Sequence, residues 1–219
     1  MRDEADGVSD VWSDRAQAYR ESEAHRQGRD LDLIVEWAAG RRTALDGATG
    51  GGHVARKLRE LGLTVVTTDA APGMEPDVIC RSEDLPFADG SFDVVACRVA
   101  AHHFDDVPRA VEEMARVSGE LVLISDNLYG GEQLEEAERL RDPSHVRNYS
   151  EDEWRGFLEA AGLRVDLAEG IAHPIELQGW LDRAACTGAD ADRVRELVAD
   201  LTAGDRVILD RIVIRAVKV

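Results

Sequence analysis

The sequence predicts an α/β fold of three layers, in which a mostly parallel sheet is covered by helices on both faces. Short apolar runs alternate with helical segments along the chain, as parallel strands joined by right-handed crossover helices do. The first of these runs leads into a glycine-rich loop and a helix, and the second ends on Asp69. Such an arrangement is typical of α/β folds that bind a ligand at the carboxyl ends of their strands. With 219 residues, the chain is long enough for one domain with a substantial core.

The helices are predicted from apolar residues that recur on one face and from start and stop signals. Segment 30–39 has such an apolar face, and Gly40 ends it. A later helix begins at a capping box, with Ser150 at the N-cap and Glu153 at the third helical position. The expected helices are 8–22, 30–39, 53–61, 108–117, 132–141, 154–161, 177–185 and 192–201.

The strands are predicted where short runs of β-branched and other apolar residues stand between these helices. Most of them fall in the first 125 residues, and two more lie near the end of the chain. We therefore expect a sheet of seven strands. The expected strands are 43–46, 64–69, 77–80, 92–97, 120–125, 163–167 and 206–219.

The composition excludes several classes of partner. The net charge of −18 opposes binding to nucleic acids, because non-specific affinity for them comes from Lys and Arg that neutralise phosphates. No apolar run approaches the ~18 residues of a membrane span, and the N-terminus is too acidic and polar for a signal peptide. We therefore expect a cytoplasmic protein with neither nucleic acid nor membrane as partner, and a homodimer stays open. The three cysteines lack C-x-x-C spacing, so they indicate neither a disulfide framework nor a zinc site.

The glycine-rich loop 47–52 predicts a site for a nucleoside-type cofactor. Glycine lets a ligand approach the backbone closely, and the following helix offers unpaired N–H groups and the positive end of its dipole. Asp69 follows at about the spacing at which an acid accepts hydrogen bonds from ribose hydroxyls. Residues 50–55 also fit the G-x-G-x-x-A motif of nicotinamide-dependent dehydrogenases. In a third interpretation, the glycines only turn the chain.

Two segments, 45–53 and 83–94, carry a resemblance to a known family. In this order they resemble class I S-adenosylmethionine-dependent methyltransferases, and they are most similar to the group that includes the ubiquinone and menaquinone biosynthesis C-methyltransferases. The resemblance is strong over residues 37–127. It implies a Rossmann-like seven-stranded sheet, mostly parallel with a late antiparallel strand, in a single domain spanning residues 1–219.

Two segments are expected to cover the site. The charged helix 132–141 and the aperiodic stretch after it predict a small helical cap inserted at residues 130–150. Residues 1–28 are expected to form an N-terminal helical lid. On that lid, Tyr19 and His25 resemble positions that often fold over the active site.

The resemblance implies that the cofactor is S-adenosylmethionine and assigns residues to each of its parts. The methionine part of the cofactor would be held by Asp46, Gly47, Ala48 and Gly50, and the ribose by Asp69. Ala70 and Met74 would flank the faces of the adenine, and Ser82 and Glu83 would meet its edge. Where many relatives have an acid that accepts from the adenine amino group, this chain has Arg81, which only donates. Adenine recognition then depends on backbone groups, or on Glu83 or Asp84. The cofactor-binding candidates are Asp46, Gly47, Ala48, Gly50, Gly52, Asp69, Ala70, Met74, Ser82, Glu83 and Arg98.

Three histidines are candidate catalytic residues. Methyl transfer from a sulfonium is an in-line displacement, so the acceptor must lie about 3 to 3.5 Å from the methyl group with water excluded. His102 and His103 follow the fourth expected strand, near the ligand edge of the sheet, where an imidazole can act as a base. His145, in the cap segment, is the third candidate. Alternatively, the first two cap the next helix or pack on Phe104, and His145 is structural and pairs with Asp142.

The function that these residues indicate is methyl transfer from S-adenosylmethionine to a carbon or oxygen of a small molecule. Arg98, Arg141 and Arg147 together suit an anionic acceptor, although ion pairs with surrounding acids are an alternative. No metal is expected, because Arg98 stands where a magnesium site formed with Asp126 and Asn127 would need an oxygen ligand. The alternative function is a non-methylating reaction on the same fold, such as a cyclisation or decarboxylation.

Overall fold

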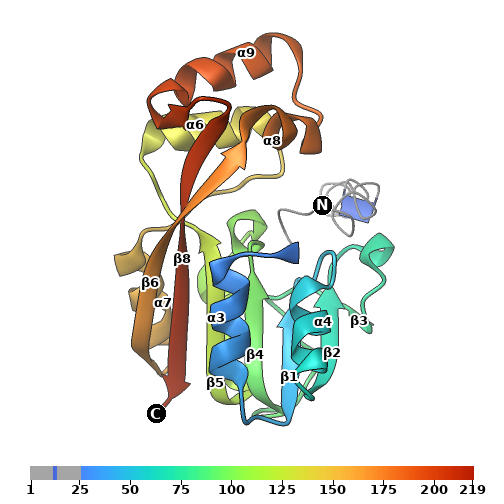
Figure 1. Ribbon diagram of the computed structural model, residues 1–219. Coiled ribbons are helices and arrows are strands. Elements are labelled where there is room, and N and C mark those ends of the chain that lie inside the picture. Colours follow the sequence, from blue (N-terminus) through green and yellow to red (C-terminus); the bar gives the residue numbers. More distant parts are fainter. Residues whose placement is uncertain (1–11, 14–25) are drawn as a thin grey trace.

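The structure, a computed structural model, describes residues 12–13 and 26–219 and confirms the α/β fold (Figure 1). Its strands form one mixed sheet in the order β3-β2-β1-β4-β5-β8-β6. The seven expected strands are present, and a further strand, β7, pairs with β8. The strands are β1 (Thr43–Gly47), β2 (Thr64–Asp69), β3 (Val78–Ile79), β4 (Phe92–Arg98), β5 (Ser118–Asn127), β6 (Leu163–Glu176), β7 (Thr202–Ala203) and β8 (Arg206–Lys218).

The first five strands are parallel, and β8 is the late antiparallel strand. It runs antiparallel to both of its neighbours, β5 and β6. Central strands β1, β4 and β5 are buried over most of their length, as expected for a sheet that is covered on both faces. Because the parallel strands share one direction, their carboxyl ends meet at one edge of the sheet.

Two pairs of helices cover the two faces of the sheet. Helices α3 (Arg29–Ala38) and α4 (His53–Glu60) pack on one face, and α5 (Val107–Val117) and α7 (Glu151–Ala160) pack on the other. The predicted capping box at the start of α7 is confirmed, since the Ser150 hydroxyl accepts from the Glu153 N–H and the Glu153 carboxylate accepts from the Ser150 N–H.

A cap of three helices stands beyond the ligand edge of the sheet: α6 (Glu132–Arg141), α8 (Leu177–Arg183) and α9 (Gly188–Leu197) (Figure 1). Strands β6 and β8 extend out of the sheet into the cap and pair there through the whole of β6. The cap has its own apolar core, which includes Trp180, Leu181 and Val194.

This cap is larger than the predicted insertion at 130–150, and β6 is longer than the predicted strand, which ended at residue 167. The reason is that β6 is an edge strand whose later residues are half-exposed, so its second half lacks an apolar run. It even contains Pro174, which an edge strand tolerates because it needs no second partner.

Part of the expected N-terminal lid lies outside the described residues, including Tyr19 and His25. Trp12 and Ser13 are described, and the Ser13 hydroxyl accepts a hydrogen bond from the Gly73 N–H. Within residues 12–13 and 26–219, no helix has the length and apolarity that crossing a membrane requires.

Candidate functional site

A cavity lies between the carboxyl ends of β1, β2 and β4 and the cap. It brings together residues that sequence analysis assigned to the cofactor and to catalysis. His102 and His103 line it, whereas Gly47, Gly52 and His145 are absent from the described residues that form the lining. The cofactor-binding candidates that line it are Asp46, Ala48, Gly50, Asp69, Ala70, Met74, Ser82, Glu83 and Arg98.

Asp46 anchors the glycine-rich loop at the end of β1. Its carboxylate accepts hydrogen bonds from the Thr49 hydroxyl at 2.5 Å and from the Ala55 N–H at 3.0 Å, so it connects the strand to the start of α4. The side chain is buried, and this burial raises its pKa to about 6. Asp46 therefore holds a charge in a poorly solvated place at neutral pH.

The loop itself has a backbone that favours glycine. Gly50 has a φ of +51° and Gly52 a φ of +71°, both in the left-handed region. A Cβ added to Gly50 would meet no protein atom within 4 Å, which leaves room beside its backbone for a ligand in the cavity. Ala48 also has a positive φ, of +50°, although it has a side chain. Backbone strain of this kind is concentrated at functional sites.

Asp69, at the end of β2, connects the loop to the turn after β2. One carboxylate oxygen accepts from the Gly50 N–H and the other from the Ala71 N–H, both at 2.9 Å. Burial raises the pKa of Asp69 in spite of these hydrogen bonds. A carboxylate has about four acceptor sites, so capacity remains for hydroxyl groups of a ligand in the cavity.

Arg81 stands where the resemblance led us to expect an acid, and its guanidinium is used in ion pairs. It pairs with Glu83 at 3.1 Å and with Asp105 at 2.6 Å. Glu83 lines the cavity, but the exposed Asp84 is not among the described lining residues. The acid available at this end of the cavity is therefore Glu83, which Arg81 orients.

His102 forms a buried pair with Asp126, the last acid of β5. Its Nδ1 lies 2.5 Å from one Asp126 oxygen, and its backbone N–H donates to the other oxygen at 3.0 Å. Burial alone would lower the pKa of His102, but the Asp126 carboxylate outweighs it and raises that pKa. Because Nδ1 is engaged by Asp126, Nε2 is the ring nitrogen left to meet a molecule in the cavity. Sequence analysis considered Asp126 only as a metal ligand and missed this pair.

His103 is held differently from its neighbour. Its Nδ1 donates to the Ser144 carbonyl at 2.9 Å, so this nitrogen carries the proton. Burial and the charge of His102 lower the pKa of His103 well below its usual range, which keeps the ring neutral. Trp12 packs edge-on against the ring at 4.6 Å. Neither histidine caps α5, because the Asp106 carboxylate does.

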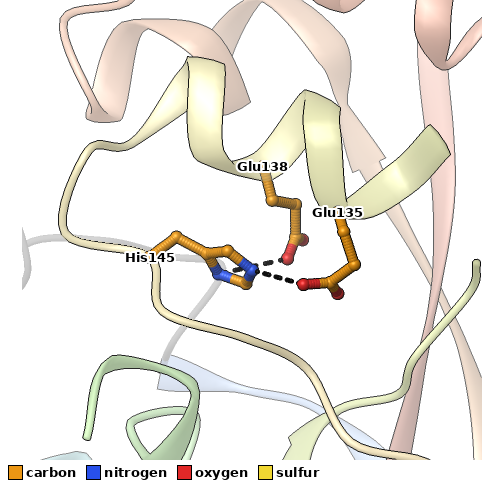
Figure 2. A group of neighbouring side chains, drawn as sticks. All are labelled: Glu135, Glu138 and His145. Atoms are coloured by element: carbon orange, nitrogen blue, oxygen red, sulfur yellow. Dashed lines mark hydrogen bonds and ion pairs between the residues drawn. The ribbon is translucent and has the colours of Figure 1, made fainter. Parts of the chain in front are cut away.

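His145 packs beside the two cavity histidines, with ring centroids 5.6 Å from His102 and 6.4 Å from His103, and it faces α6 (Figure 2). Its Nε2 lies 3.2 Å from Glu135 and its Nδ1 lies 3.4 Å from Glu138, and all three side chains are buried. Burial would raise the pKa of Glu135, but His145 outweighs it and lowers that pKa. The predicted structural partner, Asp142, is wrong as a side-chain partner, since only its carbonyl accepts from the His145 N–H.

The pairing of His145 with the two glutamates positions segment 144–147, whose backbone contacts His102 and His103. The N–H groups of Val146 and Arg147 both donate to the His102 carbonyl, and the Ser144 carbonyl accepts from His103. His145 stands in the middle of this segment. Its geometry therefore supports His102 and His103 from outside the cavity.

The three arginines that were predicted to hold an anion are separated by the structure. Arg147 is half-exposed, pairs with Glu153 at 2.6 Å, and lies outside the described lining of the cavity. Arg98 lines the cavity, but its Nε donates to the buried Asp30 at 2.6 Å. Asp30 also pairs with Arg211 of β8 at 3.2 Å, a partner that sequence analysis missed because 181 positions separate the two. Of the predicted set, Arg141 is the one that faces the cavity from the cap.

We expect Asp46→Asn to change how stability depends on pH. Raising a carboxyl pKa from 3.8 in the unfolded chain to about 6 in the folded one makes wild type lose stability as pH rises through that window. The asparagine has no such penalty. Measured by urea unfolding without cofactor, the variant should gain on the order of 2 to 3 kcal/mol relative to wild type between pH 4 and pH 7. If the free energies of unfolding of the two proteins change with pH in the same way, the assignment of a buried charge to Asp46 is contradicted.

Comparison with known proteins agrees with this geometry. A family described as a methyltransferase domain matches residues 45–121, from the strand before the glycine-rich loop into β5. The chain is 32% identical over 214 residues to YcgJ of Bacillus subtilis (strain 168), whose name is "Uncharacterized methyltransferase YcgJ". This match covers 87% of this chain and 83% of YcgJ. The chain is also 37% identical over 121 residues to YafE of Escherichia coli (strain K12), which covers 52% of this chain and 58% of that protein.

Solved structures give the same result. The crystal structure of YcgJ superposes with a TM-score of 0.76 at 28% identity, and the match covers 86% of this chain and 97% of YcgJ. At the level of fold alone, the chain is similar to magnesium protoporphyrin IX methyltransferase from Synechocystis PCC 6803, solved with bound SAH, with a TM-score of 0.64 at 14% identity over 97% of this chain and 98% of that chain. By its loop, its sheet and its relatives, the chain belongs to the class I methyltransferase family.

Proposed function

We propose that this protein transfers a methyl group from S-adenosylmethionine to a carbon or oxygen of a small molecule. The observation that carries the proposal is the cavity that joins Asp46, Asp69 and the loop around Gly50 to the His102–Asp126 pair. One end offers a backbone cradle and carboxylates for a nucleoside-type ligand. The other offers a base oriented by an acid.

The cofactor would lie along the glycine-rich loop and supply a methyl group made electrophilic by its sulfonium charge. Asp69 would accept from the ribose hydroxyls, and Glu83 stands at the adenine end. The Gly50 N–H is already used by Asp69, so the rim of the loop is rigid before a ligand arrives. The residues present therefore fit this cofactor.

His102 would act as the base. Asp126 holds the ring with Nδ1 protonated, so Nε2 would accept the proton that the acceptor carbon or hydroxyl group gives up on methylation. Asp126 raises the pKa of His102, which makes the neutral ring a stronger base; only this neutral form can accept a proton, so activity should rise as pH increases through that pKa. His103 stays neutral beside it and does not repel the positive charge that His102 gains.

Calorimetry with S-adenosylmethionine and S-adenosylhomocysteine tests the cofactor. We expect saturable binding of both, and no binding of either would overturn the proposal. A second measurement separates methylation from a non-methylating reaction. With cofactor deuterated in its methyl group and a small-molecule extract, a product should acquire the label while the demethylated cofactor accumulates in equal amount. Turnover without loss of the label would instead identify a cyclisation or decarboxylation.

A further inference from the structure

The two ends of the cavity differ in charge. Asp46, Asp69 and Glu83 line the end at the glycine-rich loop, where the lining arginines Arg81 and Arg98 are held in ion pairs with acids. Arg141, Arg183 and Arg211 line the end under the cap beside the uncharged His173, and the acid there, Asp142, accepts from Ser144. This separation occurs in a chain with 44 acidic and only 26 basic residues. Ligand groups of opposite charge are therefore favoured at the two ends.

The paired strands β6 and β8 place the basic groups on one wall. In this antiparallel ladder, His173 is opposite Leu209 and Ile171 is opposite Arg211. Opposite residues point to the same face of a sheet, and residues two apart on one strand share that face. Ile175, His173, Leu209 and Arg211 therefore form a wall in which two apolar side chains stand together with an imidazole and a guanidinium, and all four line the cavity.

This wall has hydrogen-bonding capacity that the described residues do not satisfy. Arg211 is only 4% exposed, and its Nη1 pairs with Asp30. Among the described residues, neither its Nε nor the Nε2 of His173 has a hydrogen-bond partner. Buried polar atoms of this kind are rare, because each one left unpaired costs free energy. Burial and the charge of Arg211 lower the pKa of His173 to about 4, so at neutral pH its ring is uncharged and offers one donor and one acceptor nitrogen.

Arg141 approaches the same space from the cap. Its Nε donates to the Trp180 carbonyl at 3.0 Å, and its guanidinium lies over the Trp180 ring at 4.7 Å. These contacts fix the plane of the guanidinium before a ligand binds. A planar fork held in this way suits the two oxygens of a carboxylate or phosphate, and the indole beside it suits an apolar group.

We propose that Arg141, His173 and Arg211 bind an oxyanion of the methyl acceptor, a carboxylate or a phosphate, so that the substrate is an anionic small molecule with an apolar body. The inference rests on the proposed function, because it assigns this end of the cavity to the acceptor and the other end to the cofactor. It replaces the set of Arg98, Arg141 and Arg147 that the sequence alone indicated.

The test uses the full chain saturated with S-adenosylhomocysteine, with benzoate and phenyl phosphate as anionic probes and benzamide as a neutral probe of similar shape. Binding is measured by calorimetry or ligand-observed NMR. We expect at least one anion to bind and benzamide not to bind, and we expect Arg211→Gln and Arg141→Gln each to weaken the anion at least tenfold. Arg147→Gln is the matched control, since this arginine lies outside the lining, and it should bind as wild type does.

Circular dichroism reports the folding of every variant, and the affinity of every variant for S-adenosylhomocysteine separates the possible failures. If wild type does not bind this molecule, the proposed function fails. If wild type binds it but binds neither anion, or binds benzamide equally well, only the present inference fails. If Arg211→Gln and Arg141→Gln weaken S-adenosylhomocysteine itself tenfold while remaining folded, the basic wall serves the cofactor carboxylate and the inference is overturned. Preference for benzoate or for phenyl phosphate tells which oxyanion the wall recognises.

Discussion

Replacing Asp69 by alanine should weaken the binding of S-adenosylmethionine and S-adenosylhomocysteine at least tenfold. A hydrogen bond to a charged group contributes about 1.5 to 3 kcal/mol, and one carboxylate can meet both ribose hydroxyls. The same side chain accepts from the N–H groups of Gly50 and Ala71, so its loss also loosens the loop that lines the cavity. Both effects act in the same direction. Isothermal titration calorimetry gives the affinities.

Asp84→Ala is the matched control for this experiment. Asp84 is an exposed acid close to the adenine end of the cavity, but it is not among the described residues that line it. The control should leave the affinity unchanged, and that result would also decide between Glu83 and Asp84 as the acid at the adenine end. Equal affinity of wild type and Asp69→Ala, with the fold intact by circular dichroism, would contradict the assignment of Asp69 to the ribose.

Removing the carboxylate of Asp30 should cause the largest loss of stability, about 3 to 5 kcal/mol. Asp30, Arg98 and Arg211 form a buried group in which one carboxylate oxygen accepts from Arg98 at 2.6 Å and from Arg211 at 3.2 Å. All three side chains are no more than 5% exposed. In Asp30→Ala, two buried cations lose their shared partner and repel one another. Urea unfolding at pH 7 measures the change.

Two further variants make this expectation specific. Asp32→Ala removes an exposed acid from the same turn of α3 and should change stability by no more than about 0.5 kcal/mol. The double variant Asp30→Ala, Arg211→Met removes one of the two buried guanidinium groups that lose their carboxylate partner, so it should be more stable than Asp30→Ala alone. If the double variant loses the sum of the two single effects, Asp30 does not act by neutralising Arg211.

The pH dependence follows from the same group. Burial would raise the pKa of Asp30, but Arg98 and Arg211 outweigh it and lower that pKa. A carboxyl group with a lowered folded pKa stabilises the protein above its unfolded pKa of 3.8, and this stabilisation is lost as pH falls through the folded value. The difference between wild type and Asp30→Ala should therefore shrink in acid.

Sequence reasoning worked best where local signals agree. The strand Thr64–Asp69 and the helix Glu132–Arg141 were predicted with the bounds that the structure shows, because a β-branched run stands after Gly62 in one case and Gly131 precedes a run of strong helix formers in the other. The carboxyl end of β1 was equally predictable. There, an acid followed by glycines is a local pattern whose physical use does not depend on distant parts of the chain.

The rest of the site could not be predicted because it depends on pairings between distant segments. Nothing near His102 in the sequence indicates that Asp126 will be its partner, because the two come together only when β4 and β5 pair and bring the turn after β4 to the end of β5. Similarly, Arg211 lies opposite Asn127 at the carboxyl end of β5, and His173 reaches the cavity because β6 and β8 continue past that point. The strand that carries Arg211 was predicted at 206–219, but the second half of β6, which carries His173, is half-exposed and has no apolar run, so the wall that the two strands form was not predicted.

The continuous pairing of β6 with β8 has a consequence for selectivity. Residues Leu163 to Glu176 pair with β8 with one irregularity, between Val165 and Leu167, so the sheet and the wall under the cap share one hydrogen-bonded ladder. Arg211 on β8 and Asp126 on β5, which holds the His102 ring, lie at neighbouring positions of two paired strands, so the separation between Arg211 and Asp126 is set by strand geometry rather than by a loop. In the proposed reaction, this fixed separation would select methyl acceptors by the distance between their anionic group and the atom that is methylated.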